Sequence, residues 1–436
     1  VAAAAGSALL AAALAVTSGA TGARTQQAAF KPSKVADILT RTSAEAGRQR
    51  RAGRSPKGAS SGAVKVSEDV LIDVSIWARG QVAGSELAEL RRLGARIDVA
   101  ASGPSRRGKP AYGVVSARIP FDRLDGAAAL DWVAAVTPTM PTEVDVGPNL
   151  SEGVALHRAD DVQARGVDGT GVEVGVISDG VTNLAASQAL GDLPATGINV
   201  INAGAGDEGT AMLEIVQDMA PGADLAFHAT GSGVAGHVTA LNQLVTAGVD
   251  VITEDIPFDA EPAFQQGLAA VTGENVAAAG VPVHSSAGNQ AQRHAPRVVA
   301  NGTGGGPDGA AGPFTGCALT PDNVVAIAGG ADTTFDVTLG NNATFVLQWS
   351  EPRAIFPTAG QGGFTDLNLY VMNAALTQCL GQSTAGQANG VGDTIEIVSL
   401  GMLNGTNAKV VVDVEGTSSA VAAPTVDLRW RRAAAV

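Results

Sequence analysis

The sequence has 436 residues, a formal net charge of −14 and a pI near 4.8. This acidic balance argues against a nucleic-acid partner, because proteins that bind nucleic acids carry clustered positive charge. Hydrophobic residues make up 45% of the chain. This content is enough for a large core and excludes a collagen-like or wholly disordered protein.

Residues 1–23 form an alanine-rich apolar run that ends in small residues. The run is typical of the core and cleavage region of a secretory signal peptide, although no Met or basic stretch precedes it. Its apolar core, from Ala2 to Val16, is short for a membrane span, which needs about 20 apolar residues. We therefore expect a signal-peptide remnant, a secreted protein and no stable membrane span. The alternative is an alanine-rich helix that acts as a membrane anchor.

Residues 24–66 are rich in Lys, Arg, Ser and Gly. Between Arg24 and Lys65 there are ten basic and two acidic residues, so the chain from residue 66 onward has a net charge near −22 (18 basic minus 40 acidic). A segment with so few large apolar residues buries little surface. Its composition predicts a disordered basic linker.

Residues 67–147 alternate strand and helix patterns. The strings VLIDVSIWA, ARIDVAAS, YGVVSARIP and VAAVTPT read as strands, and SELAELRRL and FDRLDGAAALDWV read as helices. The resulting β-α-β-β-α-β order is that of a ferredoxin-like α+β unit. Its place between a signal and a larger α/β region suggests an intramolecular prodomain, with an ordinary accessory domain as the alternative.

Residues 150–330 have the pattern of an α/β domain. Apolar strands such as VEVGVISD, ADLAFHAT, VDVITEDI, VPVHSSAG and NVVAIAGG alternate with helical stretches. This alternation predicts a parallel sheet with helices on both faces. Residues 331–431 then contain short strands of period two, which predict an antiparallel β-sandwich. Cys317 and Cys379 are compatible with one disulfide in an oxidising compartment.

Three segments of the α/β region carry polar residues next to strands or helices. Asp179 follows an apolar strand, and α/β folds bind their ligands at the carboxyl ends of parallel strands. Asp207 and Glu208 precede a predicted helix, whose N-terminus stabilises carboxylates. Asn289 follows another strand, where its amide is suited to donate to an oxyanion. Taken singly, each of these residues could also be an ordinary turn or cap residue.

Together, these segments resemble the subtilase superfamily of serine peptidases in order and spacing. VGVISDG is similar to the strand that carries the triad Asp, EGTAMLEIVQDMAPGADL to the helix that begins at the triad His, and SSAGN to the oxyanion-hole segment. The resemblance covers residues 167–330. It implies a partial subtilisin-like peptidase domain, with the sandwich as an insert or an accessory domain.

The sequence departs from the subtilase pattern at the triad. Glu208 stands where ordinary subtilases have His, and the position of the triad Asp falls on Ser178, with Asp179 one residue later. Glu in place of His resembles the sedolisin branch, in which Glu and Asp serve a Ser nucleophile. That branch has a further acid where this chain has Met212, and its oxyanion donor is an Asp rather than an Asn. The resemblance implies catalytic roles for Asp179, Glu208 and Asn289.

A glutamate base suits mildly acidic conditions. An ordinary Glu has a pKa near 4.3, so it stays ionised at a pH where an imidazole is already protonated. Glu208 would then accept the proton of the serine nucleophile. The alternative is that Glu208 is a remnant in an inactive paralogue.

The nucleophile is the missing part of this arrangement. Ser418 follows Gly416-Thr417 as the family's serine does, but its flanks read as strands and predict a hairpin loop of the sandwich. We therefore expect a precursor fragment that lacks the serine segment and does not cleave peptide bonds by itself.

The sequence thus predicts a secreted serine peptidase that acts on proteins or peptides, without a cofactor or a metal ion. Asp366 and Asn368 share one face of a predicted strand and suit a calcium site, but an outward polar face is the expected reading. The alternative function is a non-catalytic extracellular binding protein whose sandwich carries recognition. The peptidase hypothesis predicts that the carboxylates of Asp179 and Glu208 share a proton or a water, and that residues 70–145 pack a sheet face on helices of the peptidase domain.

Overall fold

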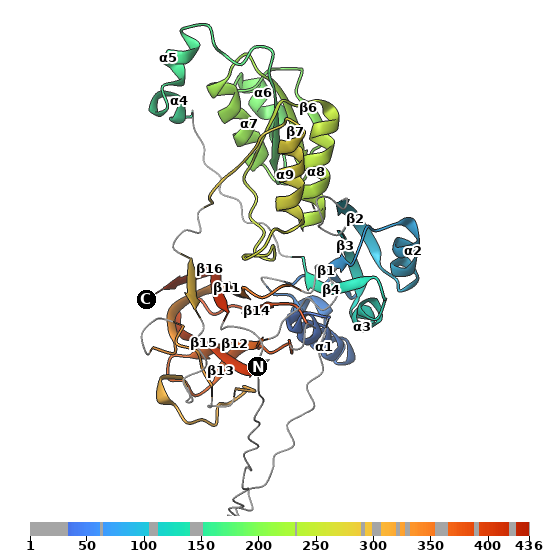
Figure 1. Ribbon diagram of the computed structural model, residues 1–436, viewed down its shortest axis with the longest axis vertical. Helices are drawn as coiled ribbons and strands as arrows, with labels where there is room; N and C mark the ends of the chain where they lie inside the picture. The colour runs from blue at the N-terminus through green and yellow to red at the C-terminus, as the bar shows by residue number, and fades with distance from the viewer. Residues whose placement is uncertain are drawn as a thin grey trace, which may run out of the picture. The chain divides into compact units, whose positions relative to one another are not determined.

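The structure is a computed structural model (Figure 1). It describes residues 34–435 except 62–63, 104–111, 140–150, 232, 289–292, 299–306, 320–322, 328–331, 354–364, 388–391 and 418–423. The signal-peptide prediction for residues 1–23 lies outside the described residues. None of the described helices is long and apolar enough to cross a membrane.

Helix α1 (Asp37–Arg51) and the short 3-10 helix η1 (Pro56–Ala59) lie where the sequence analysis expects disorder. Ile38, Leu39 and Ala46 of α1 are buried in the same apolar cluster as the strands that follow. The linker prediction is therefore wrong from residue 37 on. The average composition of the segment is polar, but its few apolar residues recur at helical spacing. A helix needs only such an apolar stripe on one face to pack against a core.

A four-stranded antiparallel sheet has the order β2-β3-β1-β4. Its elements follow one another as the sequence predicts: β1 (Leu71–Ala78), α2 (Gly84–Arg92), β2 (Arg96–Gly103), β3 (Tyr112–Pro120), η2 (Phe121–Arg123), α3 (Leu124–Ala128) and β4 (Val133–Pro138). Strand alternation sends Ile72, Val74 and Ile76 to one face, in the cluster that contains α1 residues. Trp77 points to the other face.

The parallel sheet has the order β6-β7-β5-β8-β9. Ile177 and Ala226 share a buried cluster with Leu241 and Leu244, whereas Phe227 shares another with Leu213, so different helices cover the two faces (Figure 1). The described part of the chain therefore has a mixed α/β fold with one parallel and two antiparallel sheets. The elements of this region are β5 (Glu173–Ser178), β6 (Asn199–Asn202), β7 (Asp224–Ala229), β8 (Val251–Glu254), β9 (Val283–Ser285), α4 (Gly153–Leu156), α5 (Ala159–Gln163), α6 (Leu184–Leu190), α7 (Glu208–Met219), α8 (Gly233–Ala247) and α9 (Leu268–Ala278).

The second face of the four-stranded sheet contacts helices of the parallel-sheet region. Trp77 and Val114 belong to one buried apolar cluster with Val234 and Val238 of α8 and Leu268 of α9. The Trp77 indole N–H donates to the Thr137 hydroxyl at 2.9 Å, which satisfies the polar atom of this buried ring.

The second antiparallel sheet has the order β10-β16-β11-β15-β12-β13, with β14 paired to β11. Each strand directs every second side chain to one core, which contains Phe345, Leu367, Val412 and Leu428 from four different strands. The strands are β10 (His294–Val298), β11 (Phe335–Trp349), β12 (Thr365–Asn373), β13 (Cys379–Ser383), β14 (Ile395–Ser399), β15 (Thr406–Thr417) and β16 (Thr425–Ala435); the short 3-10 helix η3 (Pro307–Gly309) lies between β10 and β11.

This sheet begins earlier in the chain than the predicted boundary at residue 331. β10 pairs with β16, and Val325 and Ile327 lie in the same core. The string NVVAIAGG is therefore no parallel strand: Val324 forms a bridge with Asp413 of β15. An apolar run of this length has no period that distinguishes the two kinds of strand.

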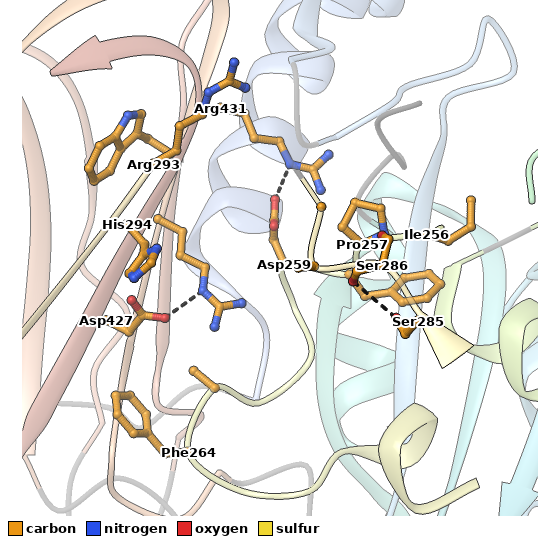
Figure 2. Close-up of a pocket in the computed structure, with 16 residues that line it drawn as sticks. Ile256, Pro257, Asp259, Phe264, Ser285, Ser286, Arg293, His294, Asp427 and Arg431 are labelled. Carbon is orange, nitrogen blue, oxygen red and sulfur yellow. Dashed lines mark hydrogen bonds and ion pairs between the residues drawn. The ribbon is translucent and has the colours of Figure 1, made fainter. Parts of the chain in front are cut away.

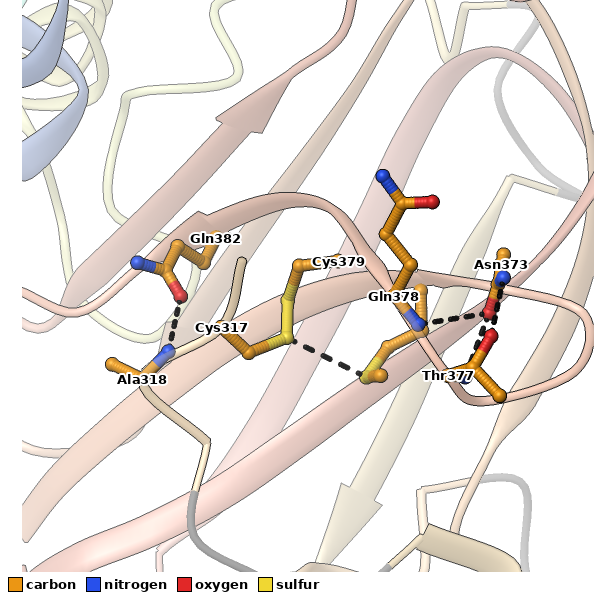
Figure 3. The surroundings of a disulfide bond; sticks show 8 residues. Cys317, Ala318, Asn373, Thr377, Gln378, Cys379 and Gln382 are labelled. Carbon is orange, nitrogen blue, oxygen red and sulfur yellow. Dashed lines mark hydrogen bonds between the residues drawn. A yellow bond between two sulfur atoms is a disulfide. The ribbon is translucent and has the colours of Figure 1, made fainter. Parts of the chain in front are cut away.

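Cys317 and Cys379 form a disulfide (Figure 3). The bond ties the segment before β11 to the start of β13. Next to it, the Ala318 N–H donates to the Gln382 side chain at 2.8 Å. The covalent tie thus holds a segment with little regular structure on the edge strand of the sheet.

Candidate functional site

The carboxyl ends of the parallel strands form one edge, which is where α/β sheets place their ligands. Asp179 directly follows β5, and Asp255 directly follows β8. β5 and β8 are neighbours, with Ile177 opposite Glu254. The loops that carry the two aspartates therefore begin side by side.

Asp179 and Glu208 meet at this edge. The Glu208 main-chain N–H donates to Asp179 Oδ1 at 3.1 Å, across 29 residues of sequence. Glu208 is the first residue of α7 and only 4% exposed. The Asp179 carboxylate thus accepts a main-chain N–H at a helix N-terminus, where negative charge is favoured.

Glycines make this approach possible. Gly180 and Gly204 form an isolated bridge between the loops after β5 and β6. A Cβ on Gly206 would overlap the Asp179 carboxylate, and one on Gly180 would overlap the Gly206 main chain. Gly180, Gly204 and Gly206 therefore allow the two loops to pack closely.

Asp207 ties the same two loops together. Its carboxylate accepts the Asn183 main-chain N–H at 2.7 Å, the Asn183 side-chain amide at 2.8 Å and the Thr210 hydroxyl at 2.8 Å. Partial burial by itself would raise the pKa of Asp207, but these hydrogen bonds outweigh it, and the pKa lies below its usual value. Asp207 is a structural anion that fixes the start of α7.

Ser178 takes no part at the edge. Its side chain is fully buried, and its Oγ has no hydrogen-bond partner among the described residues. The carboxylate that reaches the edge after β5 is that of Asp179. The sharing of a proton or a water between the Asp179 and Glu208 carboxylates stays a prediction, because the contact described above joins a carboxylate to a main-chain N–H.

Two of the predicted site residues lie outside the described residues. Asn289 follows Gly288, the last described residue of its loop, and Ser418 follows the end of β15. The prediction of a hairpin around Ser418 is wrong, because β11 lies between β15 and β16 in the sheet. Two strand patterns that adjoin in sequence predict a paired hairpin, but β15 and β16 each pair with β11 instead.

Asp366 and Asn368 are buried, at 3% and 1% exposure, so the prediction of an outward polar face is wrong. Other segments cover this face of β12: Gln387 donates its N–H to Asp366 at 3.2 Å, and Asn368 donates to Glu415 at 2.6 Å. Burial, together with the nearby carboxylates of Glu415 and Asp413, raises the pKa of Asp366 to about 7. In the described part of the chain, no three His, Cys, Asp or Glu side chains are arranged to hold a metal ion.

A cavity of about 540 Å³ lies next to the ends of β8 and β9 (Figure 2). Residues of the loops after these strands and residues of β10 and β16 line it. Arg431 forms an ion pair with Asp259, and Arg429 forms one with Asp427 at 2.6 Å. The Ser286 hydroxyl donates to Asp255. The lining residues are Ile256, Pro257, Phe258, Asp259, Ala263, Phe264, Ser285, Ser286, Ala287, Gly288, Arg293, His294, Asp427, Arg429, Trp430 and Arg431.

Sequence reasoning missed this arginine-lined cavity and the Ser286–Asp255 pair. The strand-end rule, applied to every parallel strand, would have found Asp255 and Ser286, since each follows a strand. No local signal points to Arg429 and Arg431. They come from β16, far along the chain from β8 and β9, and only the tertiary fold brings them to this edge.

The sequence matches none of the protein-family models compared with it, and no curated protein matches it. One similar solved structure is a two-domain esterase active on acetylated mannans, crystallised with mannopentaose. It shares 10% sequence identity with this chain at a TM-score of 0.20, over 64% of this chain and 95% of the esterase chain.

Proposed function

We propose that this chain belongs to a secreted serine-type peptidase of the subtilase superfamily, in its sedolisin-like branch, which hydrolyses proteins or peptides. The observation that carries the proposal is the meeting of Asp179 and Glu208 at the carboxyl edge of a parallel sheet. These are the two residues to which the resemblance assigns the roles of triad Asp and base.

In this mechanism Glu208 takes the proton of a serine hydroxyl as that oxygen attacks the peptide carbonyl. Its ionised form is required, and a glutamate is ionised at a mildly acidic pH where an imidazole is not available as a base. Asp179 holds the start of α7 through the Glu208 N–H and so orients the base. Asn289 donates to the oxyanion of the tetrahedral intermediate.

The four-stranded sheet is proposed to be a ferredoxin-like prodomain. Its apolar contact with α8 and α9 supports this role, because a folding or inhibitory prodomain must bury a face on the domain that it serves. The Cys317–Cys379 disulfide supports secretion, since disulfides persist in oxidising compartments.

The test is the hydrolysis of casein and of fluorogenic peptides between pH 3 and 8. It uses the product of the complete open reading frame that contains this sequence, and the Ser418→Ala variant of that product reports whether Ser418 is the nucleophile. We expect an optimum below neutrality and a kcat lowered about 10²–10⁴-fold by Glu208→Gln, the usual contribution of a general base. Glu214→Gln, on the same helix, is the matched control. An unchanged kcat in Glu208→Gln would refute the assigned base.

A further inference from the structure

A second cavity, of about 510 Å³, lies between α8, α9 and the ends of β8 and β9. Three glutamates line it: Glu254 at the end of β8, Glu261 in the following loop, and Glu274 on α9. No Lys or Arg belongs to the described lining. We refer to it as the glutamate-lined cavity.

The rest of its wall is mostly apolar. Leu241, Ala270, Ala277 and Val283 line it, and the volume falls in the range of small-ligand sites. An apolar wall with a few carboxylates suits a cation that carries a hydrocarbon stem, as the side chains of Lys and Arg do.

His237 adds an acceptor that does not belong to the acidic group. This α8 side chain lines the cavity, is 5% exposed, and packs its ring edge-on against Phe258. Its Nδ1 has no hydrogen-bond partner among the described residues. Burial lowers the pKa of His237 to about 4, so the ring is neutral near pH 7. A buried ring nitrogen without a partner is unfavourable. In the tautomer that carries its proton on Nε2, Nδ1 is an acceptor, and an N–H donor placed in the cavity would satisfy it.

Burial is the largest influence on the pKa values of two of these glutamates, Glu261 and Glu254. Burial raises the pKa of Glu261 to about 7, against the lowering effects of the Ala269 N–H and Arg353. Burial likewise raises the pKa of Glu254, against the lowering effects of the hydrogen bonds from the Ser285 hydroxyl and the Ile256 N–H, and Asp255 next to it adds to the rise. Arg353 already has a buried ion pair with Asp393. A cation in the cavity would therefore be attracted by carboxylates that the protein only partly compensates.

We propose that the glutamate-lined cavity binds an organic cation, an alkylammonium or alkylguanidinium group, between Glu254, Glu261 and the imidazole of His237. The group donates N–H bonds to the two carboxylates and to His237 Nδ1, and its hydrocarbon stem lies on the apolar wall. The cation is either the basic side chain of a peptide or a free amine. This binding is separate from the hydrolysis proposed above and does not depend on it.

Isothermal titration calorimetry at pH 8 tests the proposal on the full chain. The probes are N-acetyl-lysine amide, N-acetyl-arginine amide and spermidine, with the uncharged N-acetyl-norleucine amide as the matched control. We expect one saturable site for the cations and none for norleucine. Tighter binding of the amino-acid amides assigns the site to peptide side chains, and tighter binding of spermidine assigns it to free amines; both results support the cation site.

Two variants separate binding from folding. Glu254→Gln removes one carboxylate and should weaken binding at least tenfold, whereas Glu152→Gln, an exposed control outside the cavity, should not. Gly273→Leu keeps all the glutamates. A Cβ at Gly273 would meet nothing within 4 Å, so the larger side chain can enter the cavity and should abolish binding in a folded protein. Binding that survives both variants, no binding of any cation, or Ca²⁺ binding that is lost in Glu254→Gln would overturn the proposal.

Discussion

Replacing Glu261 by Gln should change how the stability of the chain depends on pH. The Glu261 carboxylate lies against Gly267, and the Ala269 N–H at the start of α9 donates to it at 3.4 Å. Burial raises its pKa to about 7 in the folded protein, from 4.5. The folded chain therefore holds a proton that the unfolded chain releases between these two pH values.

The sign follows from proton binding. Between pH 4.5 and about 7 the folded state binds more protons than the unfolded state, so the free energy of unfolding falls as the pH rises. Each pH unit of difference between the two pKa values corresponds to about 1.4 kcal/mol, so the loss amounts to about 3 kcal/mol. Gln has the same shape and does not titrate. The free energy of unfolding of the variant, relative to that of the natural chain, should therefore rise by about 3 kcal/mol from pH 4 to pH 8.

The assay is urea unfolding followed by Trp fluorescence at pH 4, 6 and 8. Comparing the variant with the natural chain at each pH cancels the other titrating groups, among them Asp366, His237 and Glu254. Glu152→Gln is the control, because an exposed carboxylate should give a difference that does not change with pH. The usual additivity error is about 0.5 kcal/mol. If the difference in free energy of unfolding between Glu261→Gln and the natural chain varies by less than this from pH 4 to pH 8, the assigned burial is refuted.

Three further predictions concern stability. Replacing Cys317 and Cys379 by Ala should lower the free energy of unfolding by about 4 kcal/mol, which is the loop-closure value for their separation of 62 residues. Denaturant unfolding of the variant and of the natural chain, with and without reductant, measures this loss. Gly206→Ala should cost about 1–3 kcal/mol, because the added methyl group displaces the Asp179 carboxylate; the thermal midpoint measures this cost, and an unchanged midpoint would contradict the close approach. Leu39→Ala should cost about 2–5 kcal/mol if α1 is part of the core; amide hydrogen exchange over residues 37–51 should then speed up, and fast exchange already in the natural chain would contradict an ordered α1.

The sequence by itself determined the classes of secondary structure and their order along most of the chain. Period-two strands and period-3.6 helices are local patterns, so the β-α-β-β-α-β unit, the parallel strands and the later antiparallel strands were readable. The position of Asp179 after a strand and of Glu208 at a helix start was readable for the same reason.

Tertiary structure decided what local patterns do not encode. α1 is ordered because a sheet supplies the apolar surface that its stripe needs, and composition alone predicted disorder there. β15 and β16 look like a hairpin in sequence, but β11 separates them. The two cavities combine residues from distant elements. Arg431 pairs with Asp259 across 172 residues of sequence, and His237 of α8 lines the same cavity as Glu261 of the loop after β8. Such pairs depend on chain crossings, which no local periodicity records.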